Sequence, residues 1–310
     1  MFKILTLIYL FIILCPHISY SIDNYKIIVK VNNEIISNHD IAKEKNYLSA
    51  LNPKILDLSE DEIKKIAKQS LIREIIKEKE VSKYYDVDYQ SPELIKLAES
   101  LYTRLNINSE KEFKIYLTKY DLDLKDVLKK LAIESNWNSL IYQKYKNQIN
   151  INKDKIKKNL ELESSIAKTE KLFLLSEIVF TAKNNDEYNN VYQKILEIIE
   201  NKDFSSAATI YSVPDSGKFG GEIGWVRKND VTEKIYKQIS TLKVGEFTKP
   251  IKIATGFLLL NIDDIKIEER ENNLDEQYNN IVIKETNRQL NQYSSIYFKK
   301  IEKKSFIYEN

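Results

Sequence analysis

The sequence predicts an α+β fold of several domains, in which a mostly helical N-terminal part precedes a smaller α+β unit and a final helix. The chain has 310 residues, which suits two or three units of about 100–150 residues each. It holds only 6 Gly and 5 Pro, which favours long helices over tight turns. Helical periodicity dominates up to about residue 168, and short strands and helices alternate after Lys171.

The first 21 residues have the pattern of a secretory signal peptide. Lys3 precedes an apolar run from Ile4 to Leu14, and Ser19 and Ser21 are small residues before a predicted cleavage site. The run is short for a membrane span, which needs about 20 residues. We therefore expect an exported chain with no stable membrane span after cleavage, and an uncleaved anchor is the alternative.

Composition excludes several classes of site. Cleavage would remove Cys15, the one cysteine, and would leave His39 as the one histidine. Disulfides, thiol catalysis, a Ser-His-Asp triad and a zinc cluster then lack the residues they need. The net charge of +2, with both signs interspersed, gives no nucleic-acid footprint. We interpret the lysines between Lys153 and Lys158 as a solvated helix face, with a phosphate-binding patch as the alternative.

A hairpin and a series of helices are predicted in the N-terminal part. Residues 25–37 form β-branched segments around an Asn32-Asn33 turn, which is typical of a β-hairpin. Cap residues precede several helices: Ser59, Ser91, Ser109 and Asn152. The stripe after the first cap comprises Ile63, Ile66, Ala67, Ser70, Leu71, Glu74 and Ile75. A long helix is predicted over residues 124–149.

The α+β unit has the predicted order β-α-α-β-α-β-β. Its first strand covers Leu172–Phe180, and its last two strands form a hairpin through Thr255-Gly256. Three of the six glycines lie between Gly220 and Val226, so the backbone turns tightly there or closely approaches another segment. A helix is predicted from Asn273 to about Lys303, and its apolar face needs a partner, for which we propose the N-terminal helices.

Residues 171–266 resemble a parvulin domain. The matching blocks occur in the family's order: D-F-S-S-A-A-T-I-Y-S at 203–212, G-G-E-I-G-W at 220–225, I-S-T-L-K-V-G-E-F-T-K-P-I at 239–251 and T-G-F-L-L-L at 255–260. The block V-N-N-E-I-I-S-x-x-D-I at 31–41 resembles the start of SurA-type periplasmic chaperones. Together these resemblances cover most of the chain after the signal.

The resemblance implies a domain organisation. After the signal peptide of residues 1–21, we expect a SurA-like helical chaperone domain at 22–168 and a parvulin-like (PpiC, rotamase) domain at 169–267. A C-terminal helix at 268–310 is expected to pack on the N-terminal domain.

The polar residues of a parvulin site are replaced in this sequence. The family uses two histidines and a Cys or Asp around the carbonyl of the X-Pro bond, whose rotation barrier is about 18–20 kcal/mol. Here the aligned residues are Glu177, Leu258 and Pro214, and Asp215 could substitute for Pro214 after a shift of one residue. Leu258 can neither donate a proton nor a hydrogen bond. We therefore expect no catalytic residue, with residual catalysis by Glu177 and Asp215 as the alternative.

The apolar pocket of the family is better preserved. Ile223, Val231 and Ile235 align with it, and with Phe257 they are candidates for peptide binding. Simple core packing is the alternative role for these residues. No metal or cofactor site is expected.

These features predict an ATP-independent periplasmic holdase for unfolded polypeptides. The sequence has no G-x-x-x-x-G-K-[ST] motif, and its 20 tyrosines suit weak aromatic binding. The resemblance suggests outer-membrane β-barrel precursors as clients. Trp137, Tyr142 and Tyr145 are candidates for groove walls or for core packing. An active prolyl isomerase and a membrane-anchored assembly factor are the alternative functions.

Overall fold

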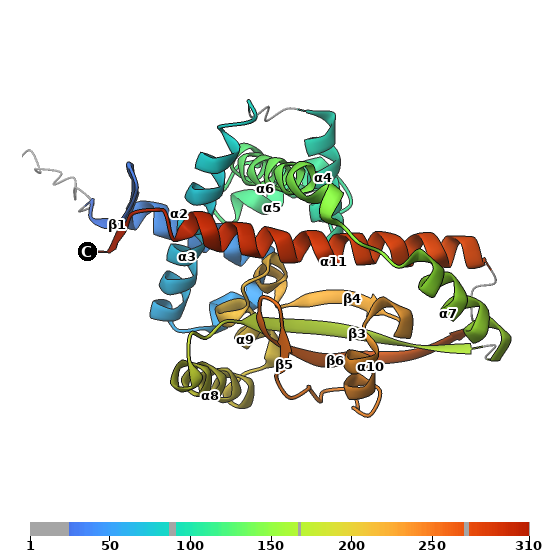
Figure 1. Ribbon diagram of the computed structural model, residues 1–310. Helices are drawn as coiled ribbons and strands as arrows, with labels where there is room; N and C mark the ends of the chain where they lie inside the picture. The colour runs from blue at the N-terminus through green and yellow to red at the C-terminus, as the bar shows by residue number, and fades with distance from the viewer. Residues whose placement is uncertain (1–24, 87–90, 167–168, 270–272, 310) are drawn as a thin grey trace, which may run out of the picture.

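The protein has the predicted α+β fold, with a helical module and an α+β unit (Figure 1). The computed structural model describes residues 25–86, 91–166, 169–269 and 273–309, so the predicted signal peptide lies outside the described residues. None of the helices in these ranges has the length and hydropathy that a membrane span requires.

In the described ranges, the helical module contains a hairpin and six α-helices. Their bounds are β1 Ile27–Val31, β2 Glu34–Ser37, α2 Asn38–Leu51, α3 Glu60–Val81, α4 Pro92–Arg104, α5 Glu110–Thr118, α6 Leu124–Tyr145 and α7 Lys153–Ile166. Ser59 and Glu62 form the predicted capping box at α3. At α5 only half of the predicted box forms, because Glu112 accepts from the backbone N–H of Asn108 while its own N–H donates to Ser109.

Several elements differ from the sequence prediction. His39 lies in the first turn of α2, since Ser37 and Asp40 form a capping box at the start of this helix. The final strand β7, Ile307–Glu309, pairs with β1 and gives a three-stranded sheet in the order β2-β1-β7. The sequence analysis missed β7 because pairing across more than 270 residues leaves no local pattern.

The C-terminal helix α11, Leu274–Glu302, lies against α3, α6 and α7, and in Figure 1 it runs between the helical module and the sheet of the α+β unit. Trp137 on α6 is 1% exposed, and its indole N–H donates to Ser294 Oγ on α11 at 2.8 Å. The rings of Tyr145 and Tyr293 stack with centroids 4.6 Å apart. An aromatic cluster thus joins the last helix to the first module.

The α+β unit has the predicted element order. Its bounds are β3 Thr169–Phe180, α8 Asn185–Asn201, α9 Phe204–Tyr211, β4 Glu222–Val226, α10 Glu233–Ile239, β5 Ile251–Ile253 and β6 Gly256–Glu269. The strands form an antiparallel sheet in the order β4-β3-β6-β5. Two apolar clusters cover its faces, one containing Ile239 of α10 and the other containing Ile195 of α8 and Phe204 of α9.

Gly221 lets β4 approach the central strand β3. Its φ is +86°, and an added Cβ would lie 2.4 Å from the carbonyl oxygen of Glu177. The backbone N–H of Glu177 donates to the Gly221 carbonyl at 2.8 Å, which holds the two segments together. Gly224 has a similar φ of +83°, but an added Cβ would meet no atom within 4 Å. Alanine at Gly224 would therefore introduce backbone strain alone, whereas alanine at Gly221 would add steric overlap.

We predict that Trp137→Ala destabilises the protein by about 3–5 kcal/mol, because it removes a fully buried aromatic side chain. Tyr142→Ala on the same helix removes a ring that is 49% exposed, and a change within about 0.5 kcal/mol is expected. Urea unfolding followed by circular dichroism measures both. Equal midpoints for the two variants would contradict the packing of α11 on α6.

We also predict that Gly221→Ala costs at least about 2 kcal/mol more than Gly224→Ala. Both alanines carry the strain of a left-handed backbone, about 1–2 kcal/mol, but only the first overlaps with the backbone of β3. Thermal and urea unfolding of the two variants give the comparison. Equal losses of stability would show that β4 does not approach β3 this closely.

Candidate functional site

The pairing of β3 with β6 brings Glu177 and Leu258 together. Glu177 lies opposite Leu260, and Leu258 lies opposite Val179, so the four side chains share one face of the sheet. Glu177 and Leu258 are therefore diagonal neighbours, as the resemblance to parvulin predicts. Leu258 is 7% exposed and belongs to the apolar cluster on this face. The sheet thus places an aliphatic side chain diagonal to Glu177.

Glu177 is a shielded carboxyl group with one side-chain partner among the described residues. Ser216 Oγ donates to its Oε1 at 2.9 Å. Burial raises the pKa of Glu177, and the hydrogen bond from Ser216 only partly opposes this shift. The carboxyl group therefore keeps a proton to a higher pH than an ordinary glutamate. Leu258, its diagonal neighbour, cannot accept or donate that proton.

The third family position lies at the start of a short 3-10 helix, Asp215–Phe219 (η3), that Pro214 precedes. Asp215 pairs with Lys218 at 3.1 Å and with Lys77 of α3 at 3.6 Å. Burial would raise the pKa of Asp215, but the ammonium groups of Lys218 and Lys77 outweigh it and hold that pKa well below its usual range. Asp215 is thus held as a carboxylate by ion pairs.

The segment around η3 is tied to the helical module. Arg73 of α3 donates to the backbone carbonyl of Val213, and Lys77 also pairs with Glu134 of α6 at 2.6 Å. The guanidinium of Arg104 lies over the ring of Phe219, 4.2 Å from its centroid. Charged and aromatic contacts therefore fix this loop against α3, α4 and α6.

The four candidate peptide-binding residues do not line one surface. Val231 and Ile235 pack against the cluster that contains Leu258. Phe257 packs on the opposite face of the sheet, with its centroid 4.6 Å from that of Tyr188, because successive residues of a strand point to opposite faces. Ile223 is 41% exposed and lies outside both clusters. The sheet therefore separates Phe257 from Val231 and Ile235, and peptide binding by these residues stays a prediction.

The aromatic candidates of α6 also separate. Trp137 and Tyr145 pack against α11, which is the core role that the sequence left open, whereas Tyr142 is exposed.

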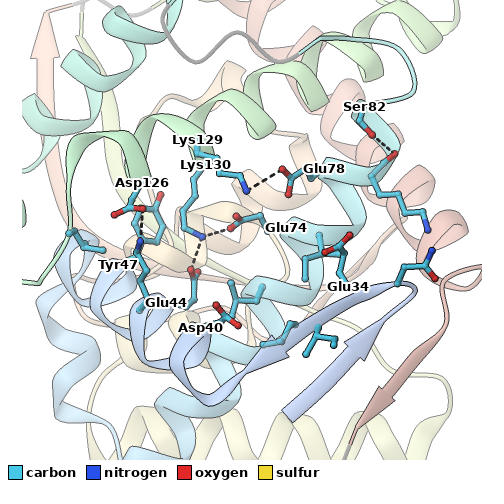
Figure 2. Close-up of a pocket in the computed structure, with 18 residues that line it drawn as sticks. Glu34, Asp40, Glu44, Tyr47, Glu74, Glu78, Ser82, Asp126, Lys129 and Lys130 are labelled. Carbon is cyan, nitrogen blue, oxygen red and sulfur yellow. Dashed lines mark hydrogen bonds and ion pairs between the residues drawn. The ribbon is translucent and has the colours of Figure 1, made fainter. Parts of the chain in front are cut away.

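Sequence reasoning missed a cavity of about 670 Å³ in the helical module, between β2, α2, α3 and α6 (Figure 2). Lys130 of α6 lies in its wall and pairs with Glu44 Oε2 at 2.6 Å and with Glu74. The presence of Ser70 and Glu74 within the apolar stripe of α3 was the signal that could have indicated a polar site.

Comparison with known proteins agrees with this geometry. Residues 171–264 match the family model of the PPIC-type PPIASE domain, named Rotamase. The match covers β3 to β6 and ends within the last strand of the sheet.

Two curated relatives and two solved structures illustrate the similarity. Chaperone SurA of Pseudomonas putida is 23% identical over 160 residues, which cover 49% of this chain and 38% of that protein. Chaperone SurA of Salmonella choleraesuis is 27% identical over 95 residues, or 31% of this chain and 22% of that protein. The chain thus matches well under half of these relatives' length.

The structural similarities are more extensive in coverage but low in score. A structure from a study of PEB4 and Cj1289, two SurA-like chaperones of Campylobacter jejuni, is 16% identical with a TM-score of 0.37. The alignment covers 92% of this chain and 98% of that one. The peptidylprolyl isomerase PrsA from Bacillus cereus is 19% identical, with a TM-score of 0.29 over 90% and 92% of the two chains. Residues 171–264 thus match the PPIC-type domain, and part of the chain is similar to proteins named chaperone SurA.

Proposed function

We propose that this protein is an ATP-independent periplasmic chaperone that holds unfolded polypeptides and does not catalyse prolyl isomerisation. Its similarity to proteins named chaperone SurA supports the chaperone role. The signal-peptide pattern of residues 1–21 supports export. Unfolded chains expose apolar segments that aggregate, and a chaperone without an ATP site releases them through weak binding alone.

The observation that carries the loss of catalysis is the position of Leu258 beside Glu177. A catalyst for X-Pro rotation needs polar groups around the carbonyl, and this face of the sheet offers an aliphatic side chain where the family has a histidine. Asp215, the nearest substitute at the third position, is engaged with Lys218 and Lys77. In this proposal the apolar surface of the domain binds unfolded polypeptides or packs within the core.

The proposed clients are outer-membrane β-barrel precursors. Their strands alternate apolar and polar residues over about ten residues, so in the unfolded state they present extended segments with one apolar face. Such segments suit strand-like docking on a chaperone. The class of client follows from the resemblance to SurA-type chaperones.

Residual prolyl isomerase activity is the second candidate function. One observation favours it, since burial raises the pKa of Glu177 and lets the protonated carboxyl donate a hydrogen bond. In this case Glu177 and Ser216 would replace the family's polar network.

We predict that the protein suppresses aggregation of a chemically unfolded substrate enzyme while leaving prolyl isomerisation unaccelerated. In a protease-coupled peptide assay, the rate is expected to stay within about twofold of the uncatalysed rate, whose time scale is tens to hundreds of seconds. Glu177→Ala should retain full suppression of light scattering, as should the surface control Glu222→Ala. Acceleration that disappears in Glu177→Ala but persists in Glu222→Ala would establish the isomerase instead.

We predict that Asp215→Asn destabilises the protein by about 1 kcal/mol at neutral pH, since the carboxylate is half exposed and solvent screens its ion pairs. The folded pKa of Asp215 lies below its ordinary value of 3.8, so its stabilisation is complete above that pH and is lost as the pH falls through the folded pKa. The difference from the parent protein should therefore be constant from about pH 8 to about pH 5 and shrink below about pH 4.

Urea unfolding across this pH range tests the carboxylate's role, with Asp57→Asn as the control because no ion pair of Asp57 occurs among the described residues. A difference that grows on acidification would mean that Asp215 is protonated in the folded protein and free for proton transfer.

A further inference from the structure

The cavity in the helical module lies along a free sheet edge. Its lining includes the four consecutive residues Asn33–Ile36. Because neighbouring residues of a strand point to opposite faces, contact with all four places the cavity along the edge of β2 and not on one face. β2 is the edge strand of the sheet β2-β1-β7, so one side of its backbone has no strand partner among the described residues. We call this cavity the β2 groove.

The floor of the β2 groove is apolar. Ile36 is 1% exposed and Leu122 is 5% exposed, while Leu71 and Ile75 of α3 are partly buried at its wall. Ile35 on β2 is 52% exposed. A segment lying along β2 would therefore find apolar surface beneath alternate side chains, which is the arrangement that strand addition uses.

The rim and wall carry an excess of negative charge. Six carboxylates line the groove, from Glu34, Asp40, Glu44, Glu74, Glu78 and Asp126, against four ammonium groups from Lys43, Lys79, Lys129 and Lys130. Two negative charges are therefore in excess. Figure 2 shows Lys129 directed at Glu78 and Lys130 at Glu44 and Glu74, so these lysines are engaged within the wall. Glu34 has no ion-pair partner in the described part of the chain.

The wall is held in one arrangement by buried interactions. Ser70 Oγ donates to Glu44 Oε1 at 2.6 Å, and the ammonium of Lys130 lies 4.8 Å from the ring centroid of Tyr47. Glu44 is only 2% exposed, and the ion pair with Lys130 and the hydrogen bond from Ser70 offset the cost of burying its charge. The groove is thus preformed and does not need to be opened by a ligand.

We propose that the β2 groove binds an extended polypeptide segment that adds to the edge of β2 and carries basic side chains toward its acidic rim. The inference rests on the proposed chaperone function and names the chemistry of the segment that it selects. Apolar side chains of the segment contact Leu71 and Ile75, and a lysine or arginine on the other face lies near Glu34. Hydrogen bonds to the backbone of β2 and contacts with the apolar floor provide the affinity. The negative charge of the rim favours segments with basic side chains over segments with acidic ones.

The experiment uses two fluorescein-labelled nine-residue peptides of alternating sequence, with valine at every second position and either lysine or glutamate between. Fluorescence anisotropy at low salt measures their affinity for the purified protein. The lysine peptide should bind more tightly, and Glu34→Lys should weaken its binding about three- to tenfold. Glu99→Lys makes the same charge change at an exposed position on α4, outside the groove, and should leave the affinity unchanged.

Hydrogen exchange locates the bound peptide. The lysine peptide should slow exchange of the backbone amides of Glu34–Ser37 and not those of Ile307–Glu309, which form the other edge strand of the same sheet. Equal effects of Glu34→Lys and Glu99→Lys, or protection without any change at β2, would overturn the proposal. Aggregation assays separate this failure from a failure of the chaperone function. Suppression by the parent protein with no protection at β2 rejects the groove alone, and no suppression at all rejects the function on which it rests.

Discussion

The antiparallel pairing of β3 with β6 is the constraint on which the rest of the α+β unit depends. Twelve consecutive residues of β3, from Thr169 to Phe180, have partners on β6, and one irregularity near Leu174 leaves the later alternation intact. This register sends Glu177, Val179, Leu258 and Leu260 to one face. A slip of one residue in either strand would exchange side chains between the two apolar clusters and separate Leu258 from Glu177. The packing of the sheet and the aliphatic side chain beside Glu177 therefore have the same origin.

The contacts around η3 connect that face to the helical module. Arg73 and Lys77 of α3 hold the backbone of Val213 and the carboxylate of Asp215, while Glu134 of α6 pairs with Lys77. The charges of this loop are thus engaged in the contact between the two units. Solvent screens the half-exposed carboxylate of Asp215, so these ion pairs contribute little net stability.

Features that depend on residues close together in the sequence could be predicted from it. The hairpin, the caps of α3 and α4 and the order of the α+β unit follow from periodicity, capping and strand alternation, whereas the proximity of Glu177 to Leu258 was expected from the resemblance to parvulin. The pairing of β7 with β1 and the β2 groove depend on residues far apart in the chain, and the one local sign of the groove was the presence of Ser70 and Glu74 in the apolar stripe of α3. Family alignment also does not show the face to which a side chain points, and the structure places Phe257 and Val231 in clusters on opposite faces of the sheet.

The central claim is that an apolar face has replaced a proton-handling network, and nuclear magnetic resonance exchange spectroscopy tests it on the bond itself. The measurement follows cis-trans exchange in a proline peptide at a substoichiometric concentration of the protein. The account predicts no exchange cross-peaks at mixing times of about a second. The reason is that uncatalysed isomerisation takes tens to hundreds of seconds. Cross-peaks that appear with the protein and grow with its concentration would contradict it.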